Sequence, residues 1–134
     1  MRYLLDTNAC VELIRGRSRR VLDRLMEHPV GSVAISSVTL AELCYGVERS
    51  SDPPRNQVAL LQFCAPLEIA PFDHRAAATY GHVRADLERM GSPVGPLDTL
   101  IAAHALSLNV ALVTANEREF KRVAGLRVEN WASR

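Results

Sequence analysis

The sequence predicts an α/β protein, a three-layer α/β/α sandwich whose helices cover both faces of a mostly parallel central sheet. Short apolar segments of strand length alternate along the chain with longer segments of helical periodicity. The strand segments are apolar throughout, so both of their faces should be buried. The helical segments between them supply the crossover connections that parallel neighbours need. These patterns do not decide the strand order or whether one edge strand is reversed.

The first half of the chain contains two of the predicted strands and three helices. In chain order these are a strand at 3–6, helices at 9–15 and 19–27, a strand at 33–36 and a helix at 37–49. Ser18 and Ser37 are suited to cap the second and third helices, because a serine hydroxyl accepts from the first free backbone N–H groups. Four apolar residues of the second helix should share one face: Val21, Leu22, Leu25 and Met26.

The second half begins at Asp52–Pro53, a pair typical of a helix start. The elements that follow are a helix through Cys64, a strand at 67–70, a helix between Asp73 and Gly91, a helix from Gly95–Pro96 to Leu108, a strand at 110–114, a short helix near Arg118 and a strand at 126–129. Apolar residues line one side of the helix that Gly95–Pro96 opens: Leu97, Leu100, Ile101, Ala105 and Leu108. Proline and glycine fall between the periodic segments, as in one folded unit.

Length and composition indicate a single domain spanning residues 1–134. The 134 residues are 48% hydrophobic, which suffices for one core and leaves no room for a second domain. No apolar stretch approaches the roughly 20 residues of a membrane span, and we expect a soluble, cytoplasmic protein. The cysteines Cys10, Cys44 and Cys64 lack metal-ligand spacing and are expected to be buried, reduced thiols.

The charge of the chain leaves a nucleic-acid partner open. The formal net charge is only +1, but every basic residue except Lys121 is an arginine, whose guanidinium group binds phosphate through paired hydrogen bonds. Five arginines crowd one short segment: Arg15, Arg17, Arg19, Arg20 and Arg24. This segment is either a solvated turn or an RNA contact, and a basic cluster alone does not decide between them.

Acidic side chains gather where the predicted strands end. In right-handed crossover units, the carboxyl ends of strands and the amino ends of helices share one edge of the sheet, where ligands bind. Asp6 ends the first strand, Glu42 lies in the second turn of the helix after the second strand, and Asp98 lies in the first turn after a proline. Asn116 and Glu119 follow the fourth strand and should lie on the same edge.

Each acid alone has an ordinary explanation, as a cap, a helix-dipole partner or a solvated helix face. Three or four carboxylates on one edge, however, repel one another and raise their own pKa values unless a cation joins them. A ligand set of oxygen atoms, without histidine or cysteine in coordination spacing, favours Mg²⁺ or Mn²⁺ over zinc. Such a site suits phosphate chemistry, because the metal lowers the pKa of bound water and neutralises phosphate charge.

Other uses of this edge remain open at this point. A phosphoaspartate at Asp6 would make the chain similar to haloacid-dehalogenase-like phosphatases or response-regulator receivers. Asn8 stands where such a phosphatase usually has a second aspartate, however, and Lys121 is the one lysine available to a receiver. A regulatory module that binds RNA or a partner without cutting is a further alternative. Packing or surface roles are expected for the histidines, which show no nucleophile pairing: His28, His74, His82 and His104.

Several motifs at these places together resemble a known family. They are Leu4-Leu5-Asp6-Thr7-Asn8, the segment 35–46 around Glu42, the segment 93–98 ending at Asp98, Leu112-Val113-Thr114 with Asn116, Glu119 and Phe120, and the closing segment 125–131. In these motifs the chain resembles the PIN-domain ribonuclease toxins called VapC over nearly its whole length. The segment 93–120 looks most like the VapC subgroup that cuts initiator tRNA in the anticodon loop.

The resemblance implies roles for the acids. Asp6 and Asp98 would be the principal Mg²⁺ ligands, and Glu42 would complete the acidic cluster directly or through water. Thr114 would help to organise the site. The fourth acid departs from the family pattern, because Asn116 stands at a position often held by aspartate. Glu119 is the nearest carboxylate, and we take it as the substitute.

The resemblance also implies an activity and partners. Metal-activated water would cleave single-stranded RNA, leaving a 3′ hydroxyl and a 5′ phosphate, and cleavage of tRNA would inhibit translation. VapC toxins form homodimers and are silenced by a VapB antitoxin peptide that covers the acidic edge. Two apolar sets could serve such interfaces but are expected in the core: Val58, Leu61 and Phe63 in one helix, and Tyr80, Val83 and Leu87 in another. Arg84 and Arg89 could line an RNA groove.

Overall fold

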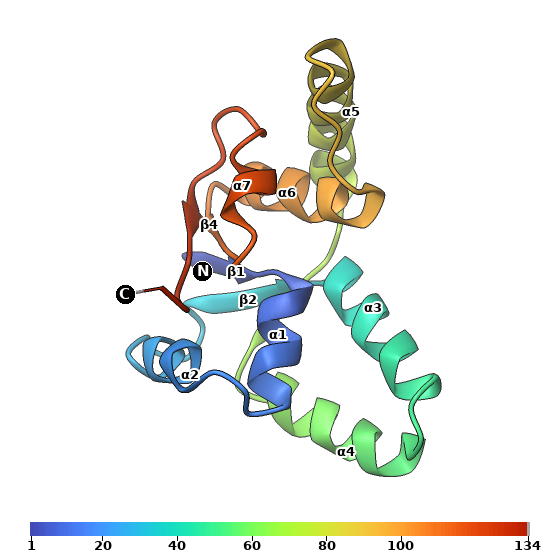
Figure 1. Cartoon of the computed structure of the whole chain (residues 1–134), viewed down its shortest axis with the longest axis vertical. Helices are drawn as coiled ribbons and strands as arrows, with labels where there is room; N and C mark the ends of the chain where they lie inside the picture. Colours follow the sequence, from blue (N-terminus) through green and yellow to red (C-terminus); the bar gives the residue numbers. More distant parts are fainter. Residues whose placement is uncertain (134) are drawn as a thin grey trace.

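A parallel sheet of five strands forms the centre of the computed structural model, which describes residues 1–133 (Figure 1). Its strands are β1 (Tyr3–Leu5), β2 (Val33–Ser36), β3 (Glu68–Ala70), β4 (Ala111–Val113) and β5 (Val128–Glu129). They lie in the order β3-β2-β1-β4-β5, with β1 in the middle. Every pairing between these neighbours is parallel, so the predicted sheet is confirmed and neither described edge strand is reversed.

Helices cover both faces of this sheet. Those of the described range are α1 (Thr7–Ile14), α2 (Arg19–Met26), α3 (Ser37–Glu48), α4 (Pro53–Cys64), α5 (His74–Arg89), α6 (Pro96–Leu108) and α7 (Glu117–Phe120). In Figure 1, α1, α2 and α4 lie below the sheet, and α5, α6 and α7 lie above it. The three-layer sandwich is confirmed. Among residues 1–133, no helix combines the length and apolar character needed to cross a bilayer.

Successive strand residues face opposite layers, and both faces are apolar. Leu4 of β1 and Leu112 of β4 pack in one core cluster with residues of α5 and α6. Leu5 and Val113, one position further along, pack in a second cluster with residues of α1, α3 and α4. Leu4 and Leu5 are both completely buried. This two-sided burial explains why the strand segments are continuously apolar.

The helix caps largely follow the sequence prediction. The Ser18 hydroxyl accepts from the Val21 N–H at 3.2 Å and caps α2, as expected. Ser37 is not the cap of α3, however. β2 runs into α3 without a loop, so Ser36 occupies the cap position and accepts from the Val38 N–H at 3.0 Å. The Ser37 hydroxyl instead accepts from the Phe72 N–H at 2.9 Å, which ties the chain after β3 to the start of α3.

α2 buries only part of its predicted apolar face. Val21 is buried and Leu25 is half-buried, whereas Leu22 and Met26 are 40% and 75% exposed. The sequence pattern predicted that these residues share a face, but not how much of that face another element covers. α2 lies at the outside of its layer (Figure 1), so the core receives only a narrow stripe of its side chains.

α4 and α5 differ in how well they fit the predicted burial. Val83 and Leu87 of α5 are buried, as expected. Val58 and Leu61 of α4 are 54% and 61% exposed, so their assignment to the core was wrong. α4 meets the core through another side, which carries the buried Leu60 and the partly buried Phe63 and Cys64, whereas Val58 and Leu61 face outwards.

The three cysteines are free thiols, but they are not all buried. Cys10 is buried, Cys64 is intermediate and Cys44 is exposed, so the expectation of burial was wrong for Cys44. On α3, Leu43 faces the core. The next residue along a helix is rotated by about 100°, which turns Cys44 towards solvent.

Candidate functional site

The carboxyl ends of β1, β2 and β4 end at the same level of the sheet and define an edge that we call the acidic rim. Leu5 of β1 is in register with Ile35 of β2 and with Val113 of β4. Asp6 and Thr114 directly follow two of these residues. α3 and α6 also begin on this side, because a crossover helix returns antiparallel to its strand. The topology therefore delivers Asp6, Glu42, Asp98 and Glu119 to one region.

Asp6 is a buried carboxylate held in place by the backbone. It caps α1, its Oδ1 accepts from the Ala9 N–H at 2.8 Å, and its side chain is only 2% exposed. Burial raises its pKa, while hydrogen bonds from the buried Thr114 and from Ala9 lower it, and the charges of Glu42 and Glu119 raise it. An acid buried beside other acids is electrostatically unfavourable in the absence of a cation.

Three neighbouring acidic side chains likewise repel the ionised carboxylate of Asp98. It lies half-buried in the first turn of α6. Burial, the charges of Glu119, Asp6 and Glu42, and a hydrogen bond shared with Glu119 raise the pKa of its carboxyl to about 6. Among residues 1–133, no arginine or lysine forms an ion pair with any of these four acids. Within the described part of the chain, the rim thus concentrates negative charge without an ion-paired basic side chain.

Two threonines position Glu42. The Thr7 hydroxyl donates to Glu42 Oε1 at 2.6 Å and lies 3.2 Å from the hydroxyl of the buried Thr39. α1 and α3 are therefore joined directly at the rim. Sequence reasoning missed both hydroxyls, since nothing in their spacing marks them, although Thr7 is adjacent to Asp6.

Glu119 and Asn116 are joined by a hydrogen bond, and Glu119 lies beside Asp98. Glu119 Oε1 accepts from the Gly95 N–H at 3.1 Å, and its Oε2 accepts from the Asn116 side-chain amide at 2.5 Å. The Asn116 N–H in turn donates to the Thr114 hydroxyl at 2.9 Å. Asn116, Glu119 and Thr114 thus lie in the region expected for them, while Gly95 joins the site through its backbone and was not singled out.

The donor set fits a hard divalent cation held by few protein ligands. Among residues 1–133, no three His, Cys, Asp or Glu side chains are arranged so that they could hold one metal ion. Asp6 and Glu42 each have an oxygen atom in a protein hydrogen bond, and Glu119 has both of its oxygens so engaged. Mg²⁺ commonly binds one or two carboxylates and retains several waters, so two carboxylates such as Asp6 and Asp98 could hold it. A closed structural metal cage is not what this rim provides.

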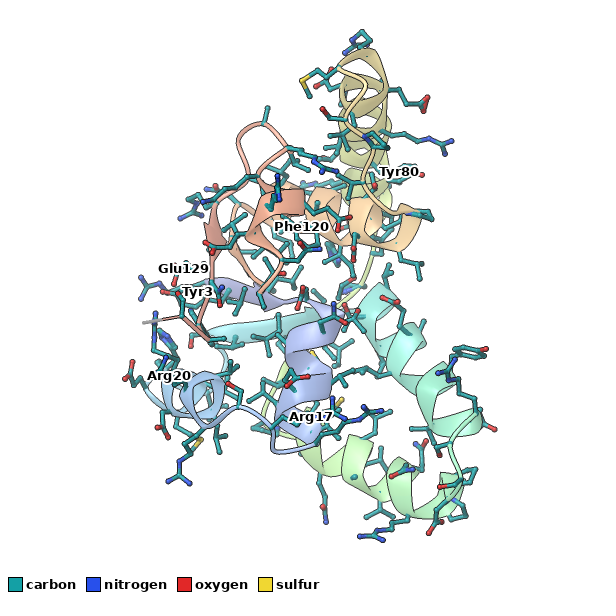
Figure 2. All side chains as sticks on the ribbon, in the orientation of Figure 1. Tyr3, Arg17, Arg20, Tyr80, Phe120 and Glu129 are labelled. Atoms are coloured by element: carbon teal, nitrogen blue, oxygen red, sulfur yellow. The ribbon has the colours of Figure 1, made fainter. Side chains whose placement is uncertain are left out.

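The arginine cluster is largely committed to other contacts. Figure 2 shows Arg17 beyond the far end of α1 and Arg20 on α2. Arg17 pairs with Glu12 at 3.6 Å, and Arg19 pairs with Asp23 at 3.3 Å. These exposed ion pairs favour the solvated-turn alternative for this part of the cluster.

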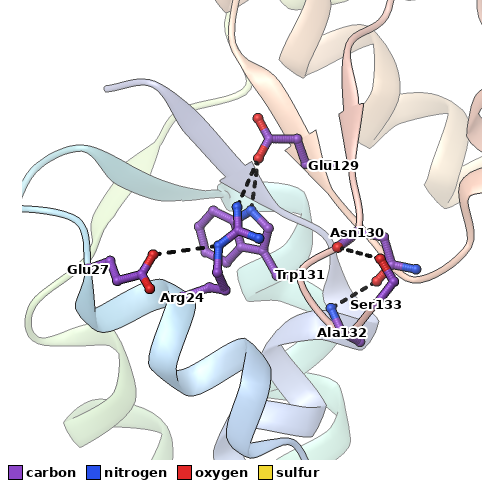
Figure 3. Close-up of polar contacts among 7 residues, drawn as sticks. All are labelled: Arg24, Glu27, Glu129, Asn130, Trp131, Ala132 and Ser133. Atoms are coloured by element: carbon purple, nitrogen blue, oxygen red, sulfur yellow. Dashed lines mark hydrogen bonds and ion pairs between the residues drawn. The ribbon is translucent and has the colours of Figure 1, made fainter.

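Arg24 has a structural role at the carboxyl end of the chain (Figure 3). Its guanidinium lies 5.5 Å from the ring centre of Trp131 and pairs with Glu129 at 3.5 Å and with Glu27 at 3.7 Å. Trp131 is buried and donates to Glu129 at 3.0 Å. These contacts fasten the chain after β5 against α2.

A groove of about 200 Å³ opens beside the rim between α1, α3 and α4. Thr7 and Glu42 form its end nearest the rim, and Arg15 is the one basic residue lining it. Apolar residues such as Val11 and Leu60 make up much of its wall. The groove therefore joins an apolar surface to a negatively charged end.

Comparisons with known proteins agree with this geometry. The PIN-domain family model matches residues 3–126. The chain is 43% identical over 132 residues to the tRNA(fMet)-specific endonuclease VapC of Shigella flexneri, with 98% of this chain and 99% of that protein covered. It is 41% identical over 131 residues to the protein of the same name from Salmonella typhimurium, with 98% of each covered. The crystal structure of DNA-bound VapBC from Salmonella typhimurium is similar at a TM-score of 0.94 and 41% identity, over 98% of each chain.

Proposed function

Because the chain belongs to the PIN-domain family and is a relative of the VapC nucleases, we propose that it is a metal-dependent endoribonuclease, the toxin of a toxin–antitoxin pair. The observation that supports this best is the acidic rim, where burial and mutual repulsion raise the pKa of both Asp6 and Asp98. A site that is unfavourable without a cation, and built of oxygen donors, suits metal-assisted hydrolysis of a phosphodiester.

We assign the cation, Mg²⁺ or Mn²⁺, to Asp6 and Asp98. When bound, it would neutralise charge on the scissile phosphate and increase the acidity of a water molecule. Asp6 is oriented for this role by the Ala9 N–H and Thr114. Glu42, which Thr7 holds, completes the negative charge of the rim directly or through water. Glu119 lies against Asp98, where its charge and a shared hydrogen bond raise the pKa of the Asp98 carboxyl.

The proposed substrate is tRNA, and specifically initiator tRNA, as in the names of the two relatives. Unpaired nucleotides of an anticodon loop can splay into an edge such as the acidic rim, whereas a duplex holds its phosphates rigidly. Cleavage would leave a 5′ phosphate and a 3′ hydroxyl and would inhibit translation. Because tRNA is a cytoplasmic substrate, we also propose a cytoplasmic location.

The proposed partner is a VapB-type antitoxin. The similar structure is a VapBC complex, which pairs a VapC chain with VapB. An arginine of the antitoxin could bind the carboxylates of the acidic rim in place of the metal, through charge-assisted hydrogen bonds. We also propose a homodimer, as the family resemblance implies.

Incubation of the antitoxin-free protein with bulk tRNA and Mg²⁺ tests the proposed activity. The wild type should cut tRNA, Asp6→Asn should lose nearly all cleavage, and Asp23→Asn, a change of an exposed aspartate on α2, should match the wild type. Equal cleavage by the wild type and Asp6→Asn would remove Asp6 from the mechanism.

Two results of the same assay would support the alternatives. RNA binding without cleavage, under every divalent metal tried, would indicate a non-catalytic RNA-binding module. A trapped aspartyl phosphate at Asp6 would indicate a phosphatase.

A further inference from the structure

We propose that Glu119 and Asn116 are positioning residues, which fix the amino end of α6 and thereby hold Asp98 at the acidic rim. This inference rests on the proposed nuclease function, since Asp98 is assigned there as a metal ligand. We call the contact of Glu119 with Asn116 and Gly95 the rim clasp. Its two hydrogen bonds, at 3.1 Å to the Gly95 N–H and 2.5 Å to the Asn116 amide, occupy both oxygens of Glu119.

The rim clasp binds the backbone of the N-cap residue of α6, a helix without a side-chain cap. α6 begins after Gly95, which has no side chain and so makes no side-chain cap hydrogen bond. Free N–H groups at a helix start need an acceptor, and a carboxylate there also complements the helix dipole. Glu119, which lies 24 residues away in sequence, provides that acceptor for Gly95. Glu119 therefore makes the contact that a glutamate in the first turn makes in a capping box, where its carboxylate accepts from the N–H of the N-cap residue.

Gly95 is well placed to transmit this restraint to Asp98. A Cβ atom at Gly95 would lie 3.8 Å from Glu119 Oε1 and 3.9 Å from Asp98 Oδ2, so the glycine backbone fits between the two carboxylates. The Gly95 carbonyl accepts from the Thr99 N–H and from the Thr99 hydroxyl, both at 2.8 Å. With its N–H and its carbonyl both bound, Gly95 has little freedom to shift the first turn of α6.

The rest of the loop before α6 is tied to the same neighbours. Arg122 donates to the Pro93 carbonyl at 2.7 Å, which adds a second link from the α7 region to this loop. Asn116 is itself anchored to the end of β4, because its N–H donates to Thr114. A continuous path thus runs from β4 through the rim clasp to α6, and it joins the surroundings of Asp6 to those of Asp98.

The pairing of residue types supports this assignment. An amide NH₂ group can donate to a carboxylate at 2.5 Å, as Asn116 does to Glu119. An aspartate at position 116 would set two carboxylates against each other and open the rim clasp. Asn116 and Glu119 therefore act as a matched pair, and the Asn116→Asp change alone should weaken the rim clasp.

Glu119→Gln and Glu119→Ala separate a positioning role from a ligand role. The glutamine carbonyl can still accept from Gly95, and the Asn116 amide can turn to present its oxygen to the new NH₂ group. Glu119→Gln should therefore keep the rim clasp without the charge, whereas Glu119→Ala removes the clasp. The matched control is Glu117→Gln, which removes one charge from the same helix at a carboxylate that faces Asn130 and Lys121.

Hydrogen exchange of the Gly95 amide, followed by NMR in the metal-free protein, reports the rim clasp without any activity. Exchange should be slow in the wild type, Glu119→Gln and Glu117→Gln, and about tenfold or more faster in Glu119→Ala and Asn116→Asp. With tRNA and Mg²⁺, kcat of Glu119→Gln should exceed that of Glu119→Ala about tenfold or more, because only the alanine variant loses the hydrogen bonds of the rim clasp.

Two outcomes would overturn the proposal. Equally slow Gly95 exchange in the wild type and Glu119→Ala would show that the rim clasp does not fix this loop. Equal loss of kcat in Glu119→Gln and Glu119→Ala, with slow exchange in the glutamine variant, would show that the charge of Glu119 matters instead of its position. If the wild type itself does not cut RNA, the proposed function fails, while the exchange data still decide whether the rim clasp holds α6.

Discussion

Replacement of Asp98 by asparagine should stabilise the metal-free protein. Burial and the charges of Glu119, Asp6 and Glu42 raise the pKa of the Asp98 carboxyl from 3.8 to about 6. In the unfolded chain this repulsion is absent, so ionised Asp98 is less favourable in the folded state than in the unfolded state. Asparagine has nearly the same shape and carries no charge, and the penalty should disappear.

The size and pH dependence of the effect follow from that pKa. A rise from 3.8 to about 6 corresponds to at most about 3 kcal/mol of unfolding free energy. Because Asp98 is only half-buried and solvent screens its neighbours, we expect about 1 kcal/mol. A raised carboxyl pKa means that stability is lost as the pH rises from about 4 to about 6. Asp98→Asn should therefore be more stable than the wild type above pH 6, and this difference should disappear below pH 4.

Urea unfolding in EDTA at pH 7.5, followed by circular dichroism, measures this difference. Asp98→Asn should unfold at a higher urea concentration than the wild type, and Asp23→Asn, at an exposed surface ion pair, should not differ from it. In 10 mM Mg²⁺ the difference in unfolding urea concentration between Asp98→Asn and the wild type should shrink or change sign, because only the wild type keeps both metal ligands. A variant that is less stable than the wild type in EDTA would refute the account of mutual repulsion.

Three further predictions concern the site and the core. Thr7→Val should lower kcat about tenfold, because Glu42 loses its hydrogen bond, whereas Thr7→Ser keeps the hydroxyl and should retain kcat. Equal rates for the two variants would show that Glu42 needs no such support. Brief alkylation followed by mass spectrometry should label the exposed Cys44 first and Cys10 last, because burial raises the pKa of the Cys10 thiol well above its usual value. Early labelling of Cys10 would contradict its burial. Trp131→Ala should reduce the unfolding free energy by about 3–5 kcal/mol in urea, and Trp131→Phe by less; a loss under about 1 kcal/mol would show that the closing segment is not part of the core.

The fold was predictable because its signals are local. Continuous apolar segments such as the one containing Leu4 and Leu5 indicate strands buried on both faces, and the intervening helices require parallel neighbours. The strand order was not predictable, since it depends on which strands meet in space. The burial of α2 was not predictable for a similar reason, because the spacing of Leu22 and Met26 marks an apolar face but not whether another element covers it.

The location of the acids was predictable for a topological reason, since parallel strands end at one edge. Asp6 and Asp98 could thus be placed together although they lie far apart in sequence. Their supporting contacts were not predictable. The Thr7 hydroxyl and the Gly95 N–H are groups that any threonine or glycine carries, and only the folded chain shows what they bind. The different surroundings of Glu42 and Glu119 likewise come from tertiary contacts.

A crystal structure of the antitoxin-free protein soaked in Mn²⁺ tests the central claim most directly, because anomalous scattering locates the ion without reference to activity. The account predicts one anomalous peak at the acidic rim, within about 2.2 Å of a carboxylate oxygen of both Asp6 and Asp98. A peak elsewhere on the protein, or one that contacts neither aspartate while the protein still cuts tRNA, would contradict it.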